Sequence, residues 1–211
     1  MLDAVIYDFG GVFVASPFNA VNRLATDRGI PGEVLNAIVF GPYGEDTDHP
    51  WHRAERGELD LRAARDAILE LGRAEGHDVD LFAMLAGFGR DDGGVRTAMV
   101  DSVRRSRAAG ARTALLTNNI AEGRGLYGKL LPLDELFDVV VDSSEVGVRK
   151  PDPRIYRHTL ELLGAAEPGR VAFLDDYPGN VLAAEAVGII GILVDDDPSA
   201  AITNLDTLLA A

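Results

Sequence analysis

Short apolar runs alternate with longer amphipathic segments along most of this chain. The first run, residues 4–7, lies between Asp3 and Asp8 and predicts a buried strand. Similar runs predict further strands at residues 113–117, 139–141, 171–174 and 189–194. Apolar positions at helical spacing predict helices over residues 95–109, 121–131, 153–163 and 199–209. A further helix is predicted after the strand 171–174 and ends at residue 187. This alternation is typical of an α/β fold, a parallel sheet with helices on both faces and right-handed crossovers.

Residues 17–90 carry no strand pattern and predict helices instead. Apolar positions recur at helical spacing in residues 18–25, 33–40, 60–74 and 80–88, and residues 41–50 form a polar, acidic loop. The glycine-rich run 89–94 is typical of a linker. We therefore expect two domains: an α/β core of residues 1–16 and 91–211, and an all-helical cap of residues 17–90 inserted after the first strand.

The composition is that of an ordinary globular protein. Its 211 residues suffice to bury a core, with 47% of them apolar and 26% charged. No apolar run reaches the ~18 residues that span a bilayer, and the first residues lack the basic segment of a signal peptide. The chain has no cysteine, so neither disulfides nor thiolate chemistry is expected. These features favour a cytoplasmic protein without a membrane partner.

The formal net charge of −14 argues against two classes of partner. Such a field repels nucleic acid and anionic membrane surfaces. It also repels a phosphorylated substrate unless a cation or a local positive group intervenes. Only Lys129 and Lys150 among the 20 basic residues are lysines, so the position of each is informative. The sequence shows no interface from which an oligomeric state follows.

Polar side chains stand where three of the predicted strands end. Asp8 follows the first strand, Thr117 ends the second, and Asp175 and Asp176 follow a later one. Lys150 lies in a loop between the last two. Because the carboxyl ends of parallel strands meet at one edge of a sheet, we expect a hydroxyl, a lysine and three carboxylates to converge there. Several hard oxygen ligands within reach of one another suit Mg²⁺.

These four segments, in this order, resemble the haloacid dehalogenase superfamily, most of whose members are Mg²⁺-dependent phosphatases. The resemblance covers nearly the whole chain, and the helical insertion matches that superfamily's cap. A narrower resemblance, to the branch of glucose-1-phosphate phosphatase and the N-terminal domain of epoxide hydrolase, rests on Glu55-Arg56-Gly57-Glu58, Arg149-Lys150-Pro151-Asp152 and Asp175-Asp176 with Asn180. The resemblance implies a Rossmann-like parallel sheet, a Mg²⁺ cofactor and a small phosphorylated substrate such as a sugar phosphate.

The resemblance also implies a role for each matching residue. Asp8 is the nucleophile, which forms an aspartyl-phosphate, while Thr117 and Lys150 neutralise the phosphoryl oxygens. The implied metal ligands are Asp8, the backbone carbonyl of Gly10 and Asp176, with Asp175 assisting directly or through water.

Substrate contacts are expected from the loops that follow the first two strands. Backbone N–H groups near Phe9, Gly10 and Asn118 are suited to hold a phosphate. Asn118 and Asn119 form a turn and are also placed to touch the substrate.

Gly10 departs from the superfamily's usual pattern. Most related phosphatases carry a second aspartate there, which protonates the leaving oxygen and later activates water, and such help is worth about 10²–10⁴ in rate. Glycine at this position can offer a metal ion its backbone carbonyl but has no side chain to act as the acid. The glucose-1-phosphate phosphatase branch resembles this chain in also having glycine there. Three explanations stay open: a leaving group that needs little protonation, such as an acyl or anomeric phosphate; a substitute from the cap; or binding without turnover. The cap candidates for proton transfer or substrate contact are Asp46, Asp48, His49 and His52.

Two other functions compete with phosphate hydrolysis. A 2-haloacid dehalogenase works without metal and lacks the acidic pair, so Asp175 and Asp176 argue against that activity. A regulatory module that binds a phosphorylated ligand without hydrolysing it is favoured by Gly10. Slow or substrate-selective hydrolysis is the interpretation that we prefer.

Overall fold

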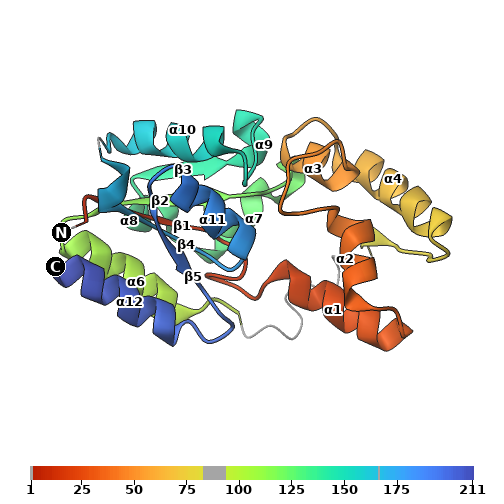
Figure 1. Cartoon of the computed structure of the whole chain (residues 1–211), viewed down its shortest axis with the longest axis horizontal. Coiled ribbons are helices and arrows are strands. Elements are labelled where there is room, and N and C mark those ends of the chain that lie inside the picture. Colours follow the sequence, from red (N-terminus) through yellow and green to blue (C-terminus); the bar gives the residue numbers. More distant parts are fainter. Residues whose placement is uncertain (1, 83–93, 166) are drawn as a thin grey trace.

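The computed structural model describes residues 2–82, 94–165 and 167–211 and contains a sheet-based part and a helical part (Figure 1). The sheet is formed by β1 (Ala4–Tyr7), β2 (Arg112–Thr117), β3 (Val139–Asp142), β4 (Val171–Asp175) and β5 (Ile190–Leu193), in the order β3-β2-β1-β4-β5. All neighbouring strands are parallel. The predicted α/β fold with a parallel sheet is confirmed, and each expected strand is found with its ends shifted by no more than one residue.

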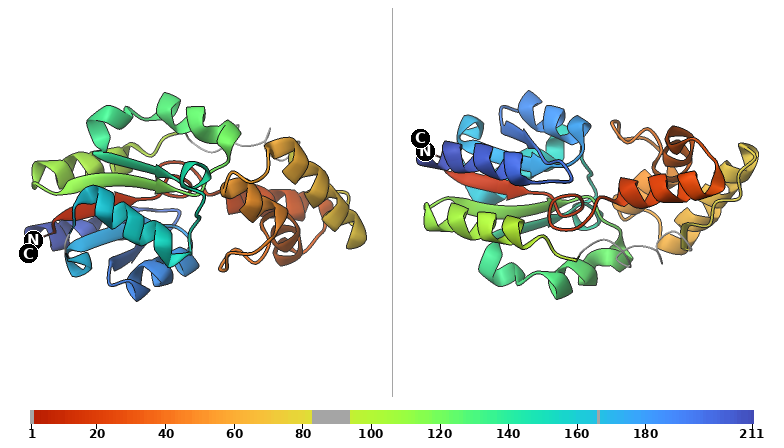
Figure 2. Two further views of the ribbon diagram at one scale, coloured as in Figure 1. Left: turned by 90° about the horizontal axis from the view of Figure 1, so that it is seen from above. Right: turned by 90° about the horizontal axis from the view of Figure 1, so that it is seen from below.

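Helices cover both faces of the sheet (Figure 2). One face carries α6 (Thr97–Ala108), α7 (Arg124–Leu130), α8 (Leu133–Leu136) and α12 (Ser199–Ala210), and the other carries α10 (Pro153–Leu163) and α11 (Pro178–Ala186). Val5 and Tyr7 of β1 belong to the first apolar layer, and Ala4 and Ile6 to the second. Because successive side chains of a strand point to opposite faces, a central strand covered on both sides is apolar throughout.

The helical part follows β1 and has an apolar core of its own. It contains α1 (Pro17–Arg28), α2 (Gly32–Phe40), α3 (Pro50–Glu55) and α4 (Leu61–Ala74). The buried side chains of Val21, Leu35 and Ile68 pack together between these helices. The helical insertion after the first strand is thus confirmed. The predicted helix 80–88 and the linker 89–94 lie almost wholly outside the described residues, so the expected domain bounds stay a prediction.

Short turns complete the connections. These are η1 (Ala121–Gly123), η2 (Pro168–Arg170) and α9 (Ser143–Val146). Asp142 ends β3 and caps α9, since its carboxylate accepts a hydrogen bond from the Ser144 N–H at 2.9 Å. This helix was not expected from the sequence, because a single turn leaves no periodic pattern.

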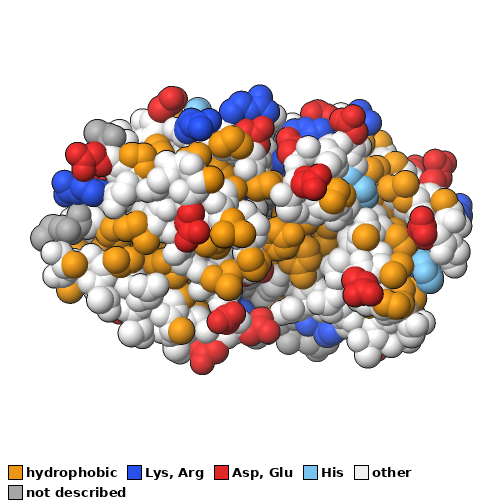
Figure 3. Space-filling model, viewed as in Figure 1, with side chains coloured by type: hydrophobic (Ala, Val, Ile, Leu, Met, Phe, Trp, Pro, Cys, Tyr) orange, Lys and Arg blue, Asp and Glu red, His pale blue; other side chains and the backbone are white. Residues whose placement is uncertain are grey.

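The two parts meet beyond the carboxyl ends of the strands, and hydrophobic side chains gather where they meet (Figure 3). Over the described part of the chain, no helix combines the length and the apolar character needed to cross a membrane. In an open parallel sheet, the region beyond the carboxyl ends of the strands is where ligands bind.

Candidate active site

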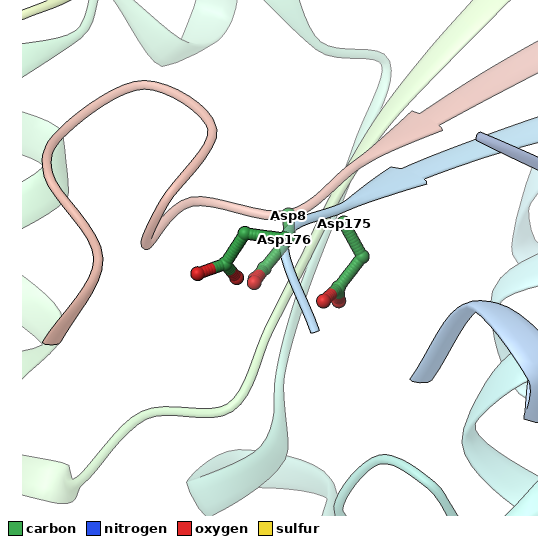
Figure 4. A group of neighbouring side chains, drawn as sticks. All are labelled: Asp8, Asp175 and Asp176. Carbon is green, nitrogen blue, oxygen red and sulfur yellow. The ribbon is translucent and has the colours of Figure 1, made fainter. Parts of the chain in front are cut away.

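Three carboxylates stand together at the carboxyl ends of β1 and β4 (Figure 4). Asp8 follows β1, Asp175 ends β4, and Asp176 comes next. Tyr7 pairs with Leu174 across the two parallel strands, so both strands end at the same level. One oxygen of each carboxylate lies within 4.8 Å of the others. The structure therefore brings these three acids to one point, as the strand ends predicted.

Lys150 joins two of these carboxylates. Its Nζ lies 2.8 Å from Asp8 Oδ1 and 2.7 Å from Asp175 Oδ2, and it donates to the Leu116 carbonyl at 3.3 Å. The side chain is 1% exposed. Burial alone would lower the pKa of Lys150, but the Asp175 and Asp8 carboxylates outweigh it, so the pKa is raised and the ammonium stays charged. A fixed positive charge therefore stands beside Asp8.

Asp175 makes its contacts within the protein. Besides the Lys150 ammonium, its carboxylate accepts the Tyr177 N–H at 2.8 Å and the Asn180 side-chain amide at 3.2 and 3.1 Å. The carboxylate is fully buried. These donors hold the Asp175 carboxylate in place beside the Lys150 ammonium.

Burial raises the pKa of the other two carboxyl groups. For Asp8 burial is the largest cause; the Lys150 ammonium lowers its pKa, and the Asp175 and Asp176 charges raise it, leaving it well above the usual range. The pKa of Asp176 is raised to about 6, first by burial and then by Asp175, while a hydrogen bond from Ser16 lowers it. A divalent cation between Asp8 and Asp176 would relieve this repulsion.

The residues present fit a Mg²⁺ ion. Mg²⁺ is usually held by one or two carboxylates and several waters, and Asp8 and Asp176 offer such oxygens. Gly11 has a φ of 69°, and a Cβ added there would overlap the Asp176 carboxyl group. The loop after β1 thus brings its backbone directly against Asp176, an approach that requires glycine. This arrangement suits the implied ligand set of Asp8, Asp176 and the Gly10 carbonyl, with Asp175 behind them.

The segment after β2 positions the Lys150 loop. The Asn118 side chain accepts the Lys150 N–H at 2.8 Å and donates to the Lys150 carbonyl at 3.0 Å. Thr117 is buried, and its hydroxyl donates to the Asn118 carbonyl at 3.3 Å. Asn119 turns toward β3 and donates to Asp142 at 2.8 Å. The sequence pattern did not reveal the function of Asn118 in holding the lysine loop.

Two cavities with several lining residues in common open over these groups. The smaller, of about 40 Å³, is lined by Asp8, Thr117 and Asp176 among others. The larger, of about 250 Å³, lies between the sheet edge and the helical part and has mostly apolar walls. Its aromatic lining includes Phe9, Phe18, Phe40, Trp51 and Tyr127. Of the residues expected to touch substrate, Phe9, Gly10, Asn118 and Asn119 all line this larger cavity.

The two cap histidines are not brought to these cavities. His49 caps α3, where its Nδ1 accepts the Trp51 N–H at 3.2 Å. His52 is buried with its Nδ1 2.9 Å from the Thr47 hydroxyl, and its pKa is lowered to about 3 by burial and by the Arg149 guanidinium. Both rings are therefore committed to the structure of the cap, and neither lines either cavity.

The two acidic candidates of the cap loop are also placed away from Asp8. Asp46 pairs with Arg56 within the helical part, and the Asp48 side chain is fully exposed. Neither carboxylate lines the two cavities. The structure thus leaves these residues without the contact that a proton donor needs.

A buried ion pair connects the two parts of the molecule and was not predicted from the sequence. Arg149 Nε lies 2.6 Å from Glu55 Oε2, and the side chains are 0% and 2% exposed. The other oxygen of Glu55 accepts from the Trp51 indole at 2.8 Å and from the Tyr43 hydroxyl at 3.1 Å. The Arg149 guanidinium also lies 4.7 Å from the centre of the Tyr43 ring. Glu55 and Arg149 stand in two of the three motifs on which the narrower resemblance rests. Those motifs were the signal in the sequence that could have pointed to this pair.

The class of protein follows from this fold and site. A family model for haloacid dehalogenase-like hydrolases matches residues 2–188. The chain therefore belongs to the haloacid dehalogenase-like hydrolase family. The predicted superfamily and the prediction of a hydrolytic enzyme are confirmed.

The chain is also similar in sequence to individual curated proteins. The chain is 28% identical over 196 residues to "Sesquiterpene phosphatase astK" of Aspergillus oryzae, covering 92% of this chain and 90% of that protein. It is 33% identical over 110 residues to "Bifunctional epoxide hydrolase 2" of Rattus norvegicus, covering 50% of this chain and 20% of that protein. The chain spans about a fifth of the length of the first curated relatives it matches. The distant relationship to epoxide hydrolase that the motifs predicted is thereby found.

A solved structure shows the same fold. It is a wild-type enzyme of this family from Bacteroides thetaiotaomicron in complex with magnesium and inorganic phosphate. The TM-score is 0.63 at 19% identity, with 93% of this chain and 96% of that chain covered. At this identity the likeness concerns the fold alone.

Proposed function

We propose that this chain is a Mg²⁺-dependent phosphatase that hydrolyses a small phosphomonoester through an aspartyl-phosphate on Asp8. The observation that carries the proposal is the setting of Asp8. Its carboxylate lines a cavity of about 40 Å³ beside the Lys150 ammonium and within 4.8 Å of Asp176. A space of that size, enough for a few water-sized groups, suits a phosphoryl group.

Each residue around Asp8 has a definite task in this proposal. Asp8, Asp176 and the Gly10 carbonyl would hold Mg²⁺, whose positive charge would relieve the repulsion between carboxylate and phosphate. The Lys150 ammonium, oriented by Asp175, neutralises a phosphoryl oxygen as charge spreads over the group. The Thr117 hydroxyl donates a hydrogen bond to another phosphoryl oxygen. Transfer to Asp8 and then to water divides one difficult displacement into two.

We further propose that the organic part of the substrate is apolar. The cavity of about 250 Å³ next to Asp8 has mainly aromatic and aliphatic walls, and its Glu55 carboxylate is already paired with Arg149. The hydroxyls of a sugar would lose their water there and meet few polar groups, because most of the wall is apolar. The similarity to a protein named as a sesquiterpene phosphatase supports the same choice. The sugar phosphate implied by the narrower resemblance is the alternative.

The test is a comparison of phosphate release from p-nitrophenyl phosphate, a prenyl monophosphate and glucose 1-phosphate, with Mg²⁺ and with excess chelator. We expect turnover only with Mg²⁺. Since each fully buried methylene is worth about 0.8 kcal/mol, kcat/KM for the prenyl substrate should exceed that for the sugar by about tenfold or more. Asp8→Asn keeps the size of the nucleophile and is the matched control. Turnover no faster than this variant on every substrate would refute the proposed function.

A module that binds a phosphorylated ligand without hydrolysis is the second candidate, because Gly10 offers no acid at the family's usual position. Calorimetric binding of a prenyl monophosphate, together with turnover no faster than Asp8→Asn, would favour it. Dehalogenation is disfavoured by Asp175 and Asp176 at the site. Chloride release from a 2-haloacid that persists in excess chelator would reverse this ranking and make dehalogenation the leading function.

A further inference from the structure

The two cavities share one stretch of wall. Its residues are Gly10, Pro17, Phe18, Tyr43, Thr117 and Asn118. If the phosphoryl group occupies the small cavity and the organic group the large one, the bridging oxygen between them lies along this shared wall. A group that protonates the leaving oxygen must therefore come from these residues or reach past them.

Only three of the six shared residues carry a polar side chain. The Asn118 amide is engaged on both sides by the Lys150 backbone. Thr117 is the last residue of β2 and lines the small cavity together with Asp8. In the proposed function its hydroxyl already donates to a phosphoryl oxygen. Gly10, where related phosphatases have their acid, has no side chain. The Tyr43 hydroxyl is the proton-bearing group that is left.

Tyr43 is held firmly at this place by its neighbours. Its hydroxyl donates to Glu55 Oε1 at 3.1 Å and accepts from the Asn118 side-chain amide at 3.4 Å. Its ring lies edge-on to Phe18 and Tyr177, with centroid separations of 5.0 Å each. Burial is the largest cause of a pKa of Tyr43 well above the usual range, so the hydroxyl carries its proton at neutral pH.

We propose that the Tyr43 hydroxyl donates its proton to the bridging oxygen of the substrate, in place of the aspartate that Gly10 lacks. This inference rests on the proposed phosphatase function and extends it to the leaving group. An apolar alcohol is a poor leaving group unless it is protonated, so the substrate class and the need for a donor agree. In the resting structure the hydroxyl donates to Glu55, so it must turn toward the substrate to act. The Arg149 guanidinium, 4.7 Å from the ring centre, then offsets part of the effect of the Glu55 carboxylate as negative charge develops on the phenol.

The protons and bonds balance over the two steps. In the first, an Asp8 oxygen bonds to phosphorus, the bond from phosphorus to the bridging oxygen breaks, and that oxygen takes the Tyr43 proton, so the alcohol leaves. In the second, water attacks the phosphorus of the aspartyl-phosphate and gives a proton to the tyrosinate. Asp8 returns to a carboxylate, Tyr43 to a phenol, and hydrogen phosphate is released.

The dependence on the leaving group tests this inference. p-Nitrophenolate leaves without a proton, whereas a saturated alkoxide does not, so we compare p-nitrophenyl phosphate with an alkyl monophosphate such as decyl phosphate. Tyr43→Phe should lower kcat/KM for the alkyl substrate by about 10²-fold or more and for p-nitrophenyl phosphate by less than about threefold. Tyr7→Phe is the matched control, because the Tyr7 hydroxyl is buried against the Ser106 hydroxyl at 2.8 Å and the residue lines neither cavity. Any effect of that variant should be equal on both substrates.

A binding measurement separates proton donation from a structural effect. A non-hydrolysable alkyl phosphonate should bind Tyr43→Phe, by calorimetry, with a Kd within about threefold of the wild-type value. Equal losses of kcat/KM on both substrates, or a lost affinity for the phosphonate, would overturn the role of Tyr43. Such results leave the phosphatase function standing, because the wild-type protein would still hydrolyse both substrates. Absence of turnover by the wild-type protein overturns both.

Discussion

Gly10 and Gly11 are adjacent, but the structure requires glycine at only one of them. Gly11 has a φ of 69° and no room for a Cβ beside Asp176. Gly10 has no positive φ, and a Cβ there would lie 3.3 Å from Pro17 Cδ, a contact that a shift of a few tenths of an ångström relieves. The missing acid at position 10 is therefore not imposed by the backbone.

This difference predicts a rescue at the residue scale. Gly10→Asp in the Tyr43→Phe background should restore kcat/KM on an alkyl phosphate by about tenfold or more, because general acid help of about 10²–10⁴ returns to the family's position. The measurement is steady-state phosphate release. Gly10→Asn, with the same size and no acidic proton, is the control and should restore nothing. Equal recovery by both variants would contradict a rescue by proton donation.

At the scale of elements, α3 and the loop before α10 are joined by the Glu55–Arg149 pair. The two residues are 94 positions apart in sequence and are buried together. Arg149 precedes Lys150, whose ammonium contacts Asp8, so this pair ties the helical part to the lysine loop. Periodicity reveals the longer helices but does not show which charge on one element meets which charge on another.

The pair predicts a large and local effect on stability. Glu55→Gln leaves the Arg149 guanidinium buried without its counter-ion and should lower the free energy of unfolding by about 3 kcal/mol. Glu58→Gln, which removes a half-exposed partner of Arg53 and Arg56, should change it by less than about 1 kcal/mol. Urea denaturation of both variants, with unchanged m values, is the measurement. Similar small changes in both would show that the buried pair adds nothing to the junction.

At the scale of the whole molecule, the protein carries a net charge of −14, and three of its acids lie together at one edge of the sheet. Lys150 offsets part of the charge of the three acids. Burial and the neighbouring Asp175 charge still raise the pKa of Asp176 to about 6. This local negative charge favours the binding of a divalent cation at the three acids. The same charge repels anions, which is a reason for the proposed phosphatase to require that cation.

Asp176 predicts how stability depends on pH. Its folded-state pKa of about 6 exceeds its ordinary value of 3.8, so between these values the native state holds a proton that the unfolded state releases. Its contribution to the stability of the metal-free protein therefore falls as pH rises from about 4 to about 6. We expect Mg²⁺ to bind the deprotonated form and to raise the melting temperature at pH 7.5 but hardly at pH 5.

Thermal unfolding at the two pH values, with and without Mg²⁺, measures this dependence. Asp176→Asn removes the titrating group without changing its size, so its response to Mg²⁺ should be small at both pH values. An equal rise in melting temperature at pH 5 and pH 7.5 in the wild-type protein would contradict a metal site that includes Asp176.

The sequence by itself determined the fold class and the family. Buried parallel strands are continuous apolar runs, so residues 4–7 and 171–174 stand out without any knowledge of the tertiary structure. Acids at the ends of those strands must converge once the strands are parallel neighbours, which made Asp8, Asp175 and Asp176 predictable as a group. These features depend on local pattern and on one topological rule.

The tertiary structure alone decided what surrounds Asp8. His49 and His52 had the right chemistry in the right loop, yet packing turned both rings into the cap. Tyr43 carried no signal, because an aromatic residue in a polar loop has the same pattern whether it packs or faces a cavity. Its place beside Asn118 depends on how the helical part docks on the sheet edge, a contact between residues 75 positions apart. Docking of this kind is set by side-chain packing between elements, which no periodicity along the chain records.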